Sequence, residues 1–334
     1  MMAIVLMKRF FDTVDRNGQS PIADQIAARW LEGAAKVRCI RASANFAFRV
    51  ETGDRSYVLR FNHASERAPE YIAAELEYIE RLAADGIQVA RPILSLSGRA
   101  IESVPTAVGV FHGVLFEALS GDSLELNNLS VEGLERWGRA LGEVHNTSEG
   151  LEIAGRPDWG DHLAMARRII PCNEAAAWAE MNEVEARLHK LPVGKANFGL
   201  IHYDFELDNM VWHGGRARIY DCDDCARYWF AADVVHALRE LFDDRAERID
   251  VGDVRFQSFL RGYRSVRRME DGELRHAPAF ARMHNLVAFA RVYRSIADGP
   301  LPNEPRWTSD LRAKLIGKLN RYRESFREHT LRHS

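Results

Sequence analysis

Residues 199–224, GLIHYDFELDNMVWHGGRARIYDCDD, gather six acidic side chains, two histidines and one asparagine between short apolar runs. Carboxylates that lie close together repel one another unless a cation lies between them. The segment is therefore expected to form a site at which a loop and a short β-ribbon direct oxygen ligands toward a positively charged partner.

Within this segment, Asp204 is followed by Asn209, and a short apolar strand then ends at Asp221. Phosphoryl transfer requires positioning and charge neutralisation more than covalent help from the protein. One carboxylate can orient the attacking hydroxyl and accept its proton, while a carboxamide oxygen and a second carboxylate can hold Mg²⁺. Asp204, Asn209 and Asp221 can supply all three groups, and their spacing allows the groups to lie at one site.

The sequence HxDxxxxN followed by a strand-borne aspartate resembles the aminoglycoside phosphotransferase and choline kinase group, the small-molecule branch of the protein-kinase-like fold. The later segment AADVVHAL matches the family's aspartate after the metal site at Asp233, and the similarity covers most of the chain. The resemblance implies that Asp204 is the catalytic base and that Asn209 and Asp221 are magnesium ligands. It also implies that His202 supports the loop and that Asp233 stabilises it.

The N-terminal part of the chain begins with strand signals. The sequence NFAFRVETGDRSYVLRFN predicts a hairpin with a turn at Gly53–Asp54, and a helix follows from Pro69 to a cap at Gly86. Glu75 shares a face with the apolar stripe of this helix, so its carboxylate either pairs with a cation such as Arg60 on the preceding strand or reaches water at the edge of the stripe.

The resemblance also implies how this part would bind a nucleotide. Arg60 would contact the phosphates and pair with Glu75, in the place of the family's usual lysine. The turn ASANF lacks glycine, which leaves a catalytically silent nucleotide-binding scaffold as an alternative. The remaining expected contacts are the polar residues of that turn, Ser43 and Asn45, and the adenine-receiving backbone of Phe116, Glu117 and Ala118.

The implied fold class is α+β: a protein-kinase-like, two-lobe fold with an N-terminal antiparallel sheet and a mostly helical C-terminal lobe. We expect a nucleotide-binding lobe over residues 1–116, with five strands and one main helix, and a catalytic and substrate lobe over residues 117–334. Ser130 is a predicted helix N-cap. Apolar residues at helical spacing predict helices over residues 131–145, 174–190, 231–243, 253–266, 279–297 and 308–328.

The composition of the chain argues against some classes of binding partner. The 334 residues carry a formal net charge of −3, which gives no electrostatic footprint for nucleic acid or an anionic membrane. No apolar run approaches the roughly 20 residues that span a bilayer. Four cysteines are too few for a disulfide framework and fit the cytoplasm, and the Cys222–Cys225 pair lacks the further ligands of a zinc site.

The expected reaction is transfer of the γ-phosphoryl group of ATP, or alternatively GTP, to a hydroxyl of a small-molecule acceptor. Glu206 and Asp208 could attract a cationic acceptor or could be solvated loop residues. A serine/threonine protein kinase of the same fold is the alternative enzyme. His145 and His236 lie among apolar neighbours and are expected to be structural.

Overall fold

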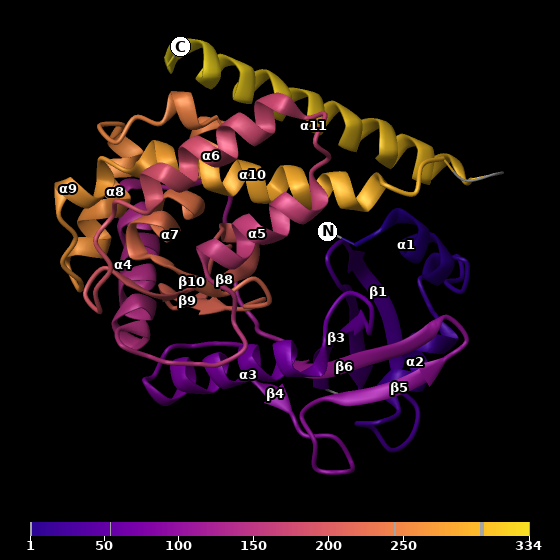
Figure 1. Cartoon of the computed structure of the whole chain (residues 1–334). Coiled ribbons are helices and arrows are strands. Elements are labelled where there is room, and N and C mark those ends of the chain that lie inside the picture. Colours follow the sequence, from indigo (N-terminus) through magenta and orange to yellow (C-terminus); the bar gives the residue numbers. More distant parts are fainter. Residues whose placement is uncertain (1, 54, 244, 301–303, 334) are drawn as a thin grey trace. The chain divides into compact units, whose positions relative to one another are not determined.

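The computed structural model describes residues 2–53, 55–243, 245–300 and 304–333. The chain divides into two compact units (Figure 1). The first comprises residues 1–76, 90–118 and 291–319, and the second comprises residues 77–89, 119–290 and 320–334. The boundary expected between residues 116 and 117 stays a prediction. In the described part of the chain, no helix is long and apolar enough to span a membrane.

An antiparallel sheet dominates the first unit. The strands follow the order β1-β2-β3-β6-β4, with β5 also paired to β6. Five strands were predicted, whereas the sheet has six, because β4 has only two residues and is too short for an alternating apolar pattern to reveal it. The strands are β1 (Lys36–Ala42), β2 (Phe46–Thr52), β3 (Arg55–His63), β4 (Pro92–Ile93), β5 (Glu102–Thr106) and β6 (Gly109–Glu117).

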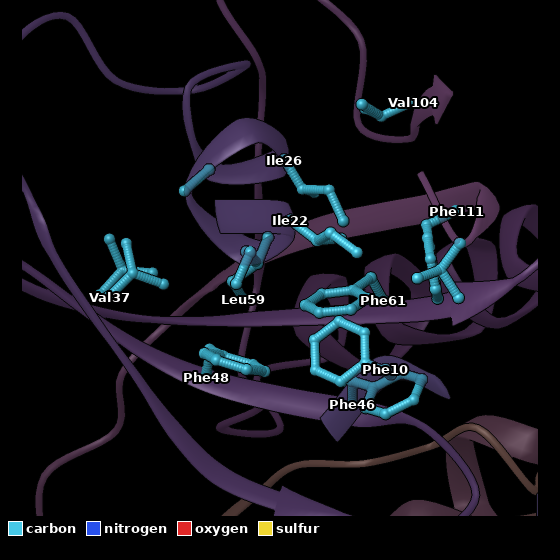
Figure 2. Packing of buried hydrophobic residues seen from close by; sticks show 14 of the residues in the cluster. Phe10, Ile22, Ile26, Val37, Phe46, Phe48, Leu59, Phe61, Val104 and Phe111 are labelled. Carbon is cyan, nitrogen blue, oxygen red and sulfur yellow. The ribbon is translucent and has the colours of Figure 1, made fainter. Parts of the chain in front are cut away.

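Two short helices that were not predicted complete the core of this unit, in addition to the predicted main helix. They are α1 (Ile4–Phe11) and α2 (Pro21–Ala27), each about two turns long and therefore below the length at which periodicity is informative. Figure 2 shows Phe10 among the aromatic residues of the sheet. Its ring centroid lies 4.1 Å from that of Phe46 and 5.5 Å from that of Phe61. The apolar residues of α1, among them Leu6, Met7 and Phe10, are thus part of this core.

The predicted hairpin and the predicted main helix are both present. Strands β2 and β3 pair in antiparallel register from Phe46 opposite Phe61 to Thr52 opposite Arg55. Of the two turn residues predicted at Gly53–Asp54, Asp54 lies outside the described residues. Helix α3 (Pro69–Ala84) ends before Gly86, whose φ of +84° provides the expected left-handed cap.

The second unit is mostly helical, and the overall α+β class is as predicted. All six predicted helices are present, and Ser130 caps the first through a hydrogen bond from the Gly133 N–H. Helix α5 was not predicted, because its buried face consists of a histidine, a leucine and an alanine and carries little apolar periodicity. The short α9 was also not predicted.

The helices after residue 130 are α4 (Val131–Ser148), α5 (Trp159–Ile169), α6 (Ala175–Leu188), α7 (Phe230–Ala237), α8 (Val254–Arg264), α9 (Asp271–Leu274), α10 (Ala277–Ile296) and α11 (Arg306–His333). The end of α10 and the first part of α11 fall within residues 291–319 and so belong to the first unit. Short 3₁₀ turns lie at η1 (Leu126–Asn128), η2 (Leu207–Asn209), η3 (Arg239–Phe242) and η4 (Ala246–Arg248). Two antiparallel strand pairs complete the unit, β7 (Phe198–Ile201) with β10 (Ala226–Trp229), and β8 (Met210–His213) with β9 (Arg216–Ile219).

Helices α4 and α8 approach closely through one glycine on each helix. A Cβ built on Gly138 would lie 1.9 Å from the carbonyl oxygen of Phe259, and one built on Gly262 would lie 1.8 Å from that of Glu135. Both obstacles are backbone atoms of the facing helix, so no side-chain rotation can relieve the overlap. The two helices can keep this separation only if both positions remain glycine.

We therefore expect Gly262→Ala to lower the free energy of unfolding by about 3 kcal/mol or more, since the helices must move apart to admit the methyl group. Gly317→Ala in α11 is the matched control, because among the described residues no atom outside its immediate chain neighbours and its own helix backbone lies within 4 Å of its Cβ position. It should be neutral or stabilise by up to about 1 kcal/mol through helix propensity. Urea denaturation measures both, and equal stability of the two variants would contradict the close contact.

Candidate active site

The segment that carries the predicted base is held by a buried carboxylate. Asp233, on α7, accepts hydrogen bonds from the backbone N–H groups of His202 at 3.0 Å and Tyr203 at 2.9 Å. Tyr203 has a φ of +72°, a conformation that costs free energy for a residue other than glycine. The two hydrogen bonds to Asp233 hold the backbone in that conformation immediately before Asp204.

The ionised state of Asp233 is itself stabilised by neighbouring side chains. Burial disfavours the charged form, but the hydrogen bond that His145 donates to the carboxylate outweighs burial, so the pKa of Asp233 lies below its ordinary value. Burial also lowers the pKa of His145, which is therefore neutral near pH 7. Its Nε2 donates to Asp233 at 3.0 Å, and its Nδ1 accepts from the hydroxyl of Tyr263 at 2.9 Å. The structural role expected for His145 is confirmed.

Both carboxylate oxygens of Asp204 are oriented by neighbours. Oδ1 accepts from Nη2 of Arg239 at 2.9 Å, and Oδ2 accepts from Nδ2 of Asn209 at 2.8 Å. The side chain of Asp204 nevertheless remains 34% exposed, so a hydroxyl can reach it. Arg239 also pairs with Glu206 at 2.6 Å. A fixed but accessible carboxylate of this kind is suited to accept a proton.

The predicted metal ligands lie at the base of the β8–β9 hairpin. The backbone N–H of Tyr220 donates to the carbonyl oxygen of Asn209 at 3.0 Å, which brings Asn209 beside the residue that precedes Asp221. The amide nitrogen of Asn209 is engaged with Asp204, so its carboxamide oxygen is directed elsewhere. Asp221 has a φ of +62°, a second strained position. A carboxamide and a carboxylate oxygen fit the ligand preference of Mg²⁺.

The chain after Asp221 is fixed by a buried arginine that was not predicted from the sequence. Arg156 donates to the carbonyl oxygens of Asp223 at 2.5 Å and Cys225 at 2.7 Å. Cys222 and Cys225 are buried free thiols, and the described residues contain no cluster of three or more histidine, cysteine, aspartate or glutamate side chains arranged to hold a metal. Arg156 and Arg239 lie outside the HxDxxxxN pattern, so that pattern gave no signal for either.

In the first unit, the predicted pair of Arg60 and Glu75 is present. Nη1 of Arg60 donates to Oε1 of Glu75 at 2.8 Å, and Nη2 donates to Oε2 at 2.5 Å. Glu75 is fully buried, so the alternative that its carboxylate reaches water was wrong. The guanidinium also lies over the ring of Phe116, 5.0 Å from its centroid. This bidentate geometry requires a planar fork, which a lysine could not provide.

The other predicted nucleotide contacts lie at two places in the first unit. Ser43 and Asn45 lie in the turn between β1 and β2, where the Ser43 N–H donates to the Asn45 carbonyl oxygen at 3.0 Å. The side-chain oxygen of Asn45 is buried and has no hydrogen-bond partner among the described residues. Glu117 ends β6, with an exposed side chain, and Ala118 follows it.

With this geometry established, the match to a family model identifies the class of protein. Residues 36–270 match the model of the phosphotransferase enzyme family, APH. The chain belongs to this family, which confirms the predicted resemblance and the predicted enzyme class, a phosphotransferase with an alcohol group as acceptor.

Individual relatives agree with the family. The chain is 23% identical to amicoumacin kinase of Bacillus subtilis over 290 residues, covering 83% of this chain and 85% of that protein. It is 22% identical to serine/threonine protein kinase RdoA of Salmonella typhimurium over 263 residues, covering 76% of this chain and 75% of that protein. The solved structure of amicoumacin kinase hAmiN in complex with AMP-PNP, Ca²⁺ and Ami has a TM-score of 0.77 at 23% identity, with 97% of this chain and 96% of that chain covered. The kinase-like fold is thereby confirmed.

A buried histidine beside the catalytic segment should make stability depend on pH. The ring of His236 lies 4.8 Å from that of Tyr203, and burial lowers the pKa of His236 to about 4. As the pH falls from 6.5 toward 4, the unfolded chain binds a proton here that the folded protein does not. The free energy of unfolding should therefore fall on acidification, by about 3 kcal/mol from this residue.

Chemical denaturation at pH 6.5 and pH 4.5 measures this dependence. The decrease in the free energy of unfolding from pH 6.5 to pH 4.5 should be smaller in His236→Phe than in the wild type. This holds even if the substitution changes the stability at pH 6.5. His213→Phe is the control for the exchange of histidine for phenylalanine itself, because His213 is exposed at the β8–β9 turn. An identical loss in wild type and His236→Phe would show that His236 titrates alike in the folded and unfolded states.

Proposed function

We propose that this protein transfers the γ-phosphoryl group of ATP, or alternatively GTP, to a hydroxyl of a small-molecule acceptor, with Asp204 as the base and Asn209 and Asp221 as magnesium ligands. The observation that carries the proposal is the geometry of Asp204. One of its oxygens accepts a hydrogen bond from Arg239 and the other accepts one from Asn209, yet the carboxylate remains accessible. The four free thiols favour a cytoplasmic location.

The proposed chemistry follows from the hydrogen-bonding capacity of the Asp204 carboxylate. Each of its oxygens uses a lone pair for Arg239 or Asn209 and retains further capacity to accept a proton. As the acceptor oxygen forms a bond to the γ-phosphorus, the bond to the ADP oxygen breaks and the hydroxyl proton moves to Asp204. Arg239 and Asn209 prevent rotation of the carboxylate and so keep it aligned with the hydroxyl.

Asn209 and Asp221 contribute the oxygen ligands of the proposed metal. When bound, Mg²⁺ would neutralise charge on the nucleotide phosphates. Asn209 has a double role in this proposal, because its amide nitrogen orients Asp204 while its oxygen serves the metal. A substitution at Asn209 would therefore disturb both the base and the metal.

In the first unit, Arg60 is proposed to contact the nucleotide phosphates. The Arg60 guanidinium carries five N–H groups, and the bonds to Oε1 and Oε2 of Glu75 at 2.8 and 2.5 Å are compatible with donation to a further anion. The buried, unpaired side-chain oxygen of Asn45 supports a polar contact at the β1–β2 turn, where Ser43 is exposed. The backbone from Phe116 to Ala118 is proposed to receive adenine.

The acceptor is proposed to be a small molecule, in keeping with the amicoumacin kinase relative. Glu206 is paired with Arg239, which offsets its charge. Asp208 has an exposed side chain and is the residue of this loop better placed to attract a cationic acceptor. Amino sugars, amino alcohols, choline-like alcohols and neutral sugars therefore form a suitable test panel.

Asp204→Asn and Asp221→Asn should each lower turnover at least about 100-fold, because one removes the base and the other removes a charged metal ligand. Asp208→Asn makes the same chemical change at an exposed position in the loop and should retain the turnover number. If Asp208 attracts the acceptor, only KM should rise. ADP release over the acceptor panel measures these effects, and full activity in Asp204→Asn would contradict the assignment.

The similarity to a serine/threonine protein kinase favours a second candidate, in which the acceptor is a protein hydroxyl. Incubation with γ-labelled ATP and separated metabolite and protein fractions of a lysate distinguishes the two. Label in metabolites supports the small-molecule acceptor, and label in protein supports the alternative. Nucleotide-dependent thermal stabilisation with no transfer to either fraction would instead indicate the silent scaffold.

A further inference from the structure

The second unit contains a groove of about 710 Å³ to which the proposed reaction assigns no role. It is lined by one face of α4, the segment from Asp85 to Gln88, and the β8–β9 hairpin. None of the predicted catalytic, nucleotide or metal residues lines it. Its volume falls in the range of about 300–1,000 Å³ that is typical of small-molecule sites.

Three arginines line this groove. Arg136 and Arg139 lie on α4, and Arg216 begins β9. In the described residues, none of the three makes a hydrogen bond or an ion pair within 4.0 Å, and all three are exposed. Asp85 and Glu143 also line the groove, but in the part of the chain that the structure describes neither forms an ion pair with an arginine within 4.0 Å. The arginine charges are therefore not neutralised by direct contacts, although Glu132 attracts Arg136 over a longer distance.

The local backbone brings these arginines to the same groove. Arg136, Arg139 and Glu143 are three and four residues apart on α4 and so share one face of the helix. The β8–β9 turn consists of Gly214 and Gly215, with φ values of +57° and +77°, which produces a tight hairpin and places Arg216 directly after it. A Cβ on Gly215 would lie 3.4 Å from Nη1 of Arg136, so the turn and α4 approach closely at this point.

We propose that this groove binds a small molecule that carries two or more oxyanion groups, either phosphates or carboxylates. Guanidinium groups match both kinds of oxyanion through paired N–H donors. Three guanidinium groups on two facing elements can bind separated anionic groups of one ligand, which a single solvated arginine cannot do. The site is distinct from the proposed active site, and its existence does not depend on the proposed reaction.

Calorimetric titration of the full chain with inorganic pyrophosphate and, separately, with succinate tests the proposal and distinguishes phosphate from carboxylate ligands. A magnesium-free buffer with EDTA disfavours binding at the nucleotide site. The test variant is Arg139→Ala combined with Arg216→Ala. The control is Arg168→Ala, which removes an exposed arginine of α5 that does not line the groove and makes no hydrogen bond or ion pair within the described ranges.

Saturable binding of at least one probe to the wild type and to Arg168→Ala, weakened tenfold or more in the double variant, would support the site. Loss of one charge-assisted contact is enough to produce that factor. The proposal is overturned if neither probe binds the wild type up to about 10 mM, if the double variant binds as the wild type does, or if Arg168→Ala weakens binding equally. Circular dichroism confirms that each variant remains folded.

Discussion

The carboxylate of Asp233 accepts hydrogen bonds from the two consecutive backbone N–H groups that precede Asp204, and the proposed active site depends on this interaction. Buried N–H groups without partners would be costly, and Tyr203 would have no compensation for its positive φ. The interaction is effective because Asp233 is ionised inside the protein, where His145 and Tyr263 form a chain of hydrogen bonds that keeps it so. The conformation of the catalytic segment is thus determined by a buried charge.

Further contacts fix the remainder of the proposed site in the second unit. Nε1 of Trp137 on α4 donates to the carbonyl oxygen of Phe205 at 3.2 Å, directly after Asp204. Arg156 holds the carbonyl groups of Asp223 and Cys225, two and four residues after Asp221. The strained residues Tyr203 and Asp221 are therefore each next to a segment whose backbone is held by a side chain from another element. Because the segments that carry Asp204 and Asp221 are oriented before the substrate binds, the free-energy barrier to the proposed phosphoryl transfer is lower.

The sequence was informative where chemistry requires a fixed spacing within a short segment. The spacing of Asp204, Asn209 and Asp221 suggested a shared site, and the structure brings Asn209 into contact with Asp204. Glu75 was placed on the buried face of its helix by periodicity alone, which was enough to suggest Arg60 as its partner. In both cases the residues lie close together in the chain, so the local secondary structure sets the distance between their side chains.

The features that could not be predicted depend on contacts between distant parts of the chain or on very short elements. Arg239 reaches Asp204 across 35 residues, and Arg156 reaches Cys225 across 69, so no local pattern indicates either. Strand β4 and helices α1 and α2 are too short to display periodicity, and their positions are determined by packing against the aromatic core of the sheet. The arginine groove likewise combines α4 with a hairpin that lies far along the chain.

The oxygens of Asn209 and Asp221 are proposed to hold a divalent cation together with a nucleotide. Mn²⁺ can replace Mg²⁺, and its binding in the presence of ATP is measured directly by the relaxation of water protons. We expect a nucleotide-dependent Mn²⁺ complex in the wild type, and we expect its affinity to fall at least tenfold in both Asn209→Ala and Asp221→Asn. Equal Mn²⁺ affinity in all three proteins would contradict it.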